Sequence, residues 1–166
     1  MGNNISLRFT GAMVASILFA FLLQSLPLPN EWLLWRPEWV ALTFIYWCLK
    51  LPKKVSMVMA WIAGLFIDVF YGSILGQHAL GMVIVVFMSL RLLPRLSVYI
   101  TWHQYVLIFL VMGTYLLINL WIMAATGSNP ATWQYWLPLL SSLIIWPIYS
   151  WVVSLFHIER SRFDEF

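Results

Sequence analysis

The chain is 166 residues long, 63% of them hydrophobic and only 9% charged, and its mean hydropathy is +0.87. A soluble globular domain carries about 25% charged residues. The composition therefore excludes a soluble fold and predicts an all-α protein with several membrane spans. The net charge of +3 does not indicate nucleic-acid binding, because the basic residues are spread along the polar segments between apolar runs. The single cysteine, Cys48, excludes a disulfide within the chain.

Six apolar runs predict six membrane spans, which form a single integral membrane domain over residues 1–166. We expect the first run to remain as an uncleaved span, because it is long for a signal peptide and no small-residue cleavage site follows it. Pro147, inside the last run, predicts a kink or the start of a second half-helix. In chain order, the predicted spans are Phe9–Leu26, Trp39–Leu51, Val55–Tyr71, Ala79–Leu93, Tyr105–Ala125 and Trp133–Phe156.

The second predicted span is too short to cross a bilayer unaided. Counted from Pro37 to Leu51 it measures about 22 Å as a helix, whereas the hydrocarbon core is about 30 Å thick. Three solutions stay open: the stretch Trp32–Trp35 extends the helix, the bilayer thins, or other parts of the protein surround it.

The stretch Gly64–Leu80 contains one acid, Asp68, with long apolar runs on both sides. Ala60, Gly64, Asp68 and Gly72 recur every four residues, which places them on one face of a helix. Such a stripe of small residues allows another helix to approach closely. We therefore expect Asp68 to point into a helix–helix contact, followed by a tight turn.

The basic residues predict the orientation of the spans. With six spans and cytoplasmic N- and C-termini, eight of the nine basic residues lie on the cytoplasmic side, which agrees with the positive-inside rule. Only Arg36 lies outside, and Asp68 then falls in the outer half of the membrane. The cytoplasmic set is Arg8, Lys50, Lys53, Lys54, Arg91, Arg95, Arg160 and Arg162.

The chain contains no pattern typical of a catalytic, cofactor or metal site. Its three histidines lie at span ends without metal-ligand spacing. Asp68, Arg36 and His78 all fall near the outer face, so two interpretations stay open. They form an outward-facing site for a ligand, a proton or a partner, or Asp68 is a buried structural acid bonded by a helix N-terminus, His78, or a neighbouring Arg or Asn. We favour the structural interpretation. Asn119, inside the fifth span, is expected to bond to a neighbouring helix.

Three segments resemble the MreD family of rod shape-determining proteins: Arg36-Pro37-Glu38-Trp39, Ile45-Tyr46-Trp47 and the glycine-rich stretch Gly64–Leu80. The length and the six-span plan also agree. The resemblance implies a fold similar to the substrate-binding subunits of energy-coupling-factor transporters and a location in the bacterial inner membrane. It implies MreC as the direct partner, and MreB, RodZ, RodA and a class B penicillin-binding protein as indirect ones. The family supplies no catalytic residues.

Two functions follow as hypotheses. The first is a non-enzymatic scaffold that joins MreC to the peptidoglycan synthesis machinery and maintains rod shape. The alternative is a small-molecule-binding subunit of a membrane transporter. An intramembrane enzyme is a third and weaker hypothesis. We expect contact with membrane lipid, no nucleic acid, no cofactor and possible self-association. The candidate structural or partner-binding residues are Arg36, Pro37, Gly64, Asp68, Gly72, Gly76 and His78.

Overall fold

A computed structural model describes residues 2–27, 29–92, 101–127 and 133–161. Every regular element in these ranges is helical, which confirms the predicted all-α class. The long helices follow the predicted runs, but the end of the fourth run, at Leu93, lies outside the described residues. The elements are α1 (Gly2–Ser25), α2 (Asn30–Leu33), α3 (Trp39–Lys50), α4 (Met57–Tyr71), α5 (Gln77–Leu92), α6 (Thr101–Ala125), the 3₁₀ turn η1 (Trp133–Trp136) and α7 (Leu137–Ser161).

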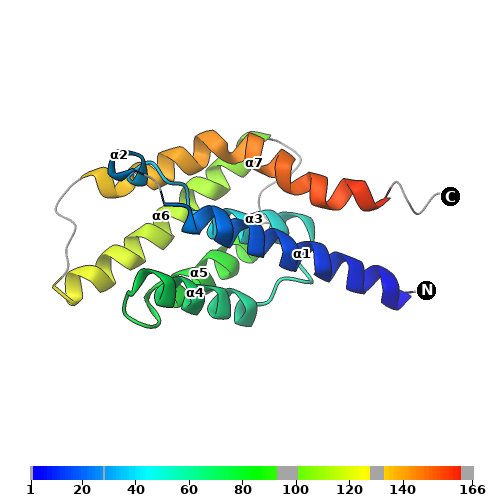
Figure 1. Ribbon diagram of the computed structural model, residues 1–166, viewed down its shortest axis with the longest axis horizontal. Coiled ribbons are helices and arrows are strands. Elements are labelled where there is room, and N and C mark those ends of the chain that lie inside the picture. The colour runs from blue at the N-terminus through cyan, green and yellow to red at the C-terminus, as the bar shows by residue number, and fades with distance from the viewer. Residues whose placement is uncertain (1, 28, 93–100, 128–132, 162–166) are drawn as a thin grey trace.

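Successive long helices run in opposite directions along the axis of an elongated bundle (Figure 1). The first residues of α1 and the last residues of α7 lie at the same end, and the α4–α5 turn lies at the opposite end. Lys50 ends α3, and Lys53 and Lys54 follow it in the connection to α4, so these basic residues are far from Arg36, which precedes α3. The orientation of the helices relative to a membrane stays a prediction.

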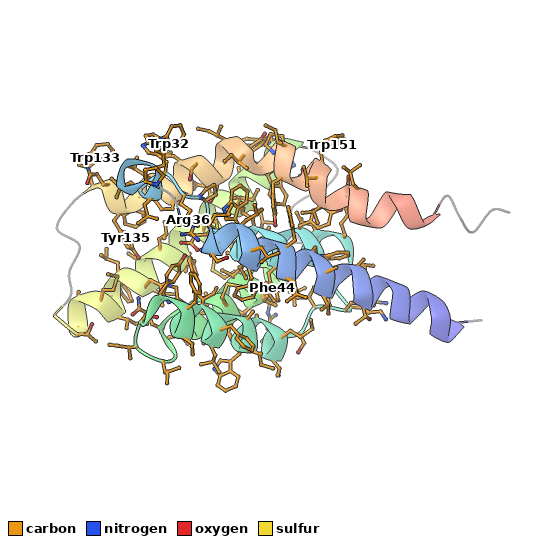
Figure 2. The ribbon with its side chains drawn as sticks, in the orientation of Figure 1. Trp32, Arg36, Phe44, Trp133, Tyr135 and Trp151 are labelled. Carbon is orange, nitrogen blue, oxygen red and sulfur yellow. The ribbon has the colours of Figure 1, made fainter. Side chains whose placement is uncertain are left out.

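Helix α3 lies in the centre of the bundle. Every residue from position 40 to position 48 is buried, including Phe44, which Figure 2 shows deep between the other helices. The helix contacts α1, α5, α6 and α7. The Trp47 indole donates a hydrogen bond of 2.8 Å to Ser16 Oγ on α1, and the Thr43 and Tyr149 hydroxyls bond α3 to α7. Because the protein surrounds α3 on all sides, the helix does not need the length of a lipid-exposed span.

Two helical segments are long and apolar enough to cross a membrane by length and composition, Trp102–Ala125 and Trp133–Leu155. The other apolar helical segments are shorter: Thr10–Ser25, Trp39–Lys50, Met57–Tyr71 and Gln77–Leu92. Large apolar side chains such as Phe66 and Val69 on α4 and Ile144 and Ile148 on α7 point outward. Pro147 lies inside α7, which continues through it as one helix rather than dividing into two.

Candidate functional site

The α4–α5 turn is shaped by two glycines. Gly72 ends α4 in the left-handed conformation (φ +63°), and its N–H bonds back to the carbonyls of Asp68 and Val69. Gly76 precedes α5 with φ +102°. Only glycine adopts such angles without steric cost. The glycines therefore let the chain reverse within a few residues and bring the start of α5 beside the end of α4.

The carboxylate of Asp68 lies at the N-terminus of α5 and is fully buried. Its Oδ1 accepts hydrogen bonds from Ser73 Oγ and from the backbone N–H of His78, each at 2.8 Å, and lies 2.8 Å from His78 Nδ1. Its Oδ2 accepts from the N–H groups of Gly76 (2.9 Å) and Ala79 (3.3 Å). The first amides of a helix have no partner within that helix and carry a partial positive charge. Asp68 therefore caps α5 from the neighbouring helix.

Asp68, His78 and Ser73 lie in mutual contact, but their geometry differs from a serine hydrolase triad. In a triad, the two nitrogens of the imidazole bond to different partners, the aspartate and the serine. Here His78 Nδ1 faces both Asp68 Oδ1 (2.8 Å) and Ser73 Oγ (3.2 Å), while Ser73 itself donates to the aspartate. This arrangement holds a turn together and leaves no nitrogen between serine and aspartate to relay a proton.

Gly64 is the point of closest approach between α4 and α5. A Cβ atom built on Gly64 would lie 2.3 Å from Ala79 Cα, 2.6 Å from Ala79 N and 2.8 Å from His78 O. Non-bonded carbon atoms prefer about 3.5–4.0 Å, so only glycine fits. Ala60, one turn earlier, is also fully buried. The predicted small-residue stripe is thus the face on which α5 packs.

A second polar cluster, which sequence reasoning missed, lies at the same end of the bundle and connects α1, α3 and α4. The amide nitrogen of Gln24 donates to Glu38 Oε2 (3.0 Å) and to the Tyr71 hydroxyl (2.9 Å). The amide oxygen of Gln24 accepts from the Trp39 N–H at the start of α3 (3.0 Å). One glutamine therefore joins three helices. The only signal in the sequence was a pair of polar residues, Gln24 and Glu38, at the ends of two apolar runs.

Arg36 and Pro37 belong to this second cluster. Pro37 is buried, and its carbonyl accepts from the Trp39 N–H (3.0 Å) as α3 begins. The Arg36 guanidinium lies over the Tyr71 ring, 5.9 Å from its centroid. The Tyr71 and His78 rings are 5.6 Å apart. The seven candidate residues thus divide between two adjoining groups, which Tyr71 connects.

An open pocket of about 530 Å³ lies beside these groups, between the α4–α5 turn and the facing ends of α6 and α7. Tyr115 and Asn119 of α6 are buried in its wall, and the Tyr115 hydroxyl and Asn119 Oδ1 have no hydrogen-bond partner among the described residues. The predicted bond from Asn119 to a neighbouring helix is not formed within these ranges; its Nδ2 donates to the Tyr115 carbonyl on the same helix. The polar residues of the lining are Glu38, Tyr71, Ser73, Gln77, His78, Tyr115, Asn119, Gln134 and Tyr135.

The wall of this pocket can hydrogen-bond a small polar molecule, through Glu38, Tyr115 and Asn119. Asp68 does not line it, and its own oxygens are occupied by the turn. Within the described ranges, no three His, Cys, Asp or Glu side chains come together as metal ligands do.

The comparisons with known proteins agree with each other. The family model for the rod shape-determining protein MreD matches residues 7–157, which include both polar groups. The chain is also similar to the rod shape-determining protein MreD of Haemophilus influenzae, with 29% identity over 153 residues, 90% of this chain and 91% of that protein. No solved structure matches the chain.

Proposed function

The chain belongs to the MreD family of rod shape-determining proteins, and we propose that it acts as a non-enzymatic scaffold of the rod complex in the bacterial inner membrane. Family membership supports a role in determining rod shape. The proposed finer role is to hold MreC and, through it, the peptidoglycan synthesis machinery. In this proposal the chain crosses the membrane six times, with both termini in the cytoplasm.

The hydrogen bonds of the Asp68 carboxylate are the main observation in support of the scaffold proposal. An acid at membrane depth is costly and usually functional. Here both of its oxygens bond to the start of α5, so its polarity stabilises a helix joint. Together with a glycine contact that allows no Cβ atom, this favours a rigid helical body over a reaction centre.

The outward apolar faces of α4 and α7 support contact with lipid and with a partner's membrane helix. Phe66 and Val69 on α4 are 64% and 70% exposed, and Ile148 and Trp151 on α7 are 65% and 63% exposed. Side chains three or four residues apart share one side of a helix. Each pair therefore forms an unpartnered apolar strip that a transmembrane segment of MreC can cover.

Affinity purification from membranes in mild detergent tests the scaffold. We expect MreC to be recovered with the tagged chain, and we expect depletion of the chain to round rod-shaped cells. Paired alanine variants, Phe66→Ala with Val69→Ala and Ile148→Ala with Trp151→Ala, serve as matched comparisons of the two strips. If one of these double variants no longer recovers MreC, the strip that it alters is the face that contacts MreC. Normal rod shape and wall insertion after depletion would refute the proposal.

The pocket beside Tyr115 favours a second candidate function, a small-molecule-binding subunit of a transporter. Its volume of about 530 Å³ falls in the range of ligand sites, about 300–1,000 Å³, and two buried polar atoms in its wall have no partner among the described residues. Mass spectrometry of the purified chain tests this. A small molecule retained by the wild type and lost in both Tyr115→Phe and Asn119→Leu would support a transporter subunit. Protein without such a molecule, but with MreC bound, would favour the scaffold.

A further inference from the structure

A groove of about 610 Å³ lies on the outer surface between α7 and the segment that joins α2 to α3. Its rim is apolar and outward-facing: Trp32 is 67% exposed and Ile144 is 69% exposed. Figure 2 shows Trp32 at the outer edge of the bundle and Arg36 farther in, at the same end. The groove is lined mainly by Trp32, Trp35, Arg36, Pro37, Ser141 and Ile144.

Arg36 brings a positive charge to this apolar groove, and no carboxylate among the described side chains forms a salt bridge with it. Its Nε and Nη2 atoms are buried and have no hydrogen-bond partner among the described residues. Glu38 lies near enough to attract Arg36 electrostatically, but its side chain bonds to Gln24 and forms no salt bridge with the guanidinium. The Tyr71 ring offers only a cation–π contact, at 5.9 Å. A guanidinium held away from water is costly unless an anion pairs with it.

We infer that this groove binds the headgroup of an anionic phospholipid, with Arg36 pairing with the phosphate and an acyl chain lying along Trp32 and Ile144. The guanidinium fork matches two phosphate oxygens in shape and charge. Tryptophans gather at the headgroup level of membranes, and Trp32 and Trp35 flank Arg36 here. A purely apolar partner helix would cover the rim and leave the guanidinium unpaired, so charge complementarity selects the lipid. This inference goes beyond the scaffold role.

The position of the groove identifies the leaflet. Arg36 lies at the end of α3 opposite Lys50, Lys53 and Lys54. In the proposed orientation those lysines face the cytoplasm, so the lipid belongs to the outer leaflet. A lipid held there would occupy the surface between α2 and α7.

Native mass spectrometry of the full chain, with dioleoyl phosphatidylglycerol or dioleoyl phosphatidylcholine added in equal amounts, tests the inference. We expect the wild type to retain one phosphatidylglycerol about tenfold more strongly than phosphatidylcholine. Arg36→Gln should remove this preference, and Arg36→Lys should keep part of it because the charge remains without the fork. Lys53→Gln, at an exposed cation of the opposite end, is the matched control and should bind as the wild type does.

Two results would overturn the inference: equal retention of both lipids by the wild type, or undiminished phosphatidylglycerol binding by Arg36→Gln. If Arg36→Gln fails to fold, Ile144→Trp decides, because it fills the groove from an exposed position and leaves the charge unchanged. We expect Ile144→Trp to lose the retained lipid while its helix content stays normal. Wild-type lipid binding by a folded Ile144→Trp would show that the groove is not the site.

Discussion

Adding one methyl group at Gly64 should separate α4 from α5. The new Cβ atom of Gly64→Ala would lie 2.3 Å from Ala79 Cα. Since carbon atoms in contact need about 3.5 Å, the backbones must move apart by about 1.2 Å. The obstacle is backbone, so no side chain can turn aside to make room.

The same movement would break the cap on α5. The Asp68 bonds to the N–H groups of His78 and Gly76 are 2.8 and 2.9 Å long, and a separation of about 1.2 Å lengthens them beyond the hydrogen-bond range of about 2.7–3.2 Å. Overpacking costs about 1–3 kcal/mol, and each lost bond to a charged group costs about 1.5–3 kcal/mol. Alanine regains about 1 kcal/mol of helix propensity over glycine. We expect Gly64→Ala to lower the free energy of unfolding by at least about 3 kcal/mol.

Gly113→Ala on α6 is the matched control. A Cβ atom there meets only the end of the Leu139 side chain, at 3.5 Å. This variant should gain about 0.5–1 kcal/mol from helix propensity. The measurement is reversible unfolding in mixed micelles of rising SDS content, followed by tryptophan fluorescence. Equal stability of Gly64→Ala and the wild type would refute the close-contact reasoning, and Gly64→Leu would then also be tolerated.

Four further variants, at Asp68, Gly76 and Gln24, test the polar groups and the turn by the same unfolding measurement. Asp68→Asn should cost about 2 kcal/mol, because its amide nitrogen must face the Gly76 and Ala79 amides or their neighbours, and Asp68→Leu should cost more; equal losses would argue against capping. Gly76→Ala should cost about 1–2 kcal/mol through its positive φ alone, since nothing lies within 4 Å of its Cβ position; an unchanged stability would contradict the strain. Gln24→Glu places a second carboxylate beside Glu38, where the amide lies 3.0 Å from Oε2. It should destabilise the fold at neutral pH and recover as the pH falls, because protonation of one carboxyl relieves the repulsion; a loss independent of pH would point to packing instead.

The joint around Asp68 could be predicted because all of its parts lie close together in the sequence. The four-residue spacing of Ala60, Gly64 and Asp68 defines a helix face, and the glycines that follow define a turn. A tight turn brings the next helix onto that face. Among the partners expected for a structural Asp68, the structure identifies the backbone amides at the N-terminus of α5 and His78.

The hydrogen bonds that Gln24 makes to other helices could not be predicted, because their partners lie far apart in the sequence. Gln24, Glu38 and Tyr71 come from three separate segments, and one sequence does not tell which helix ends meet. Asn119 shows a related limit. A Cβ atom at Gly81 would lie 2.8 Å from the Tyr115 ring and 3.1 Å from Asn119 Nδ2. The close packing of α5 on α6 thus confines the amide, and its bond goes to its own helix.

The burial of α3 has a consequence for the order of assembly. Twelve residues give a helix of only about 18 Å, too short for a stable span by itself, and its Thr43 contact comes from Tyr149 of α7, 106 residues later in the chain. A nascent chain therefore holds its central helix incompletely enclosed until α7 has been synthesised. Ribosome-bound chains that end before α7 should be sensitive to membrane proteases, and chains that include α7 should be resistant, so the synthesis of α7 is the step that commits the protein to its final fold.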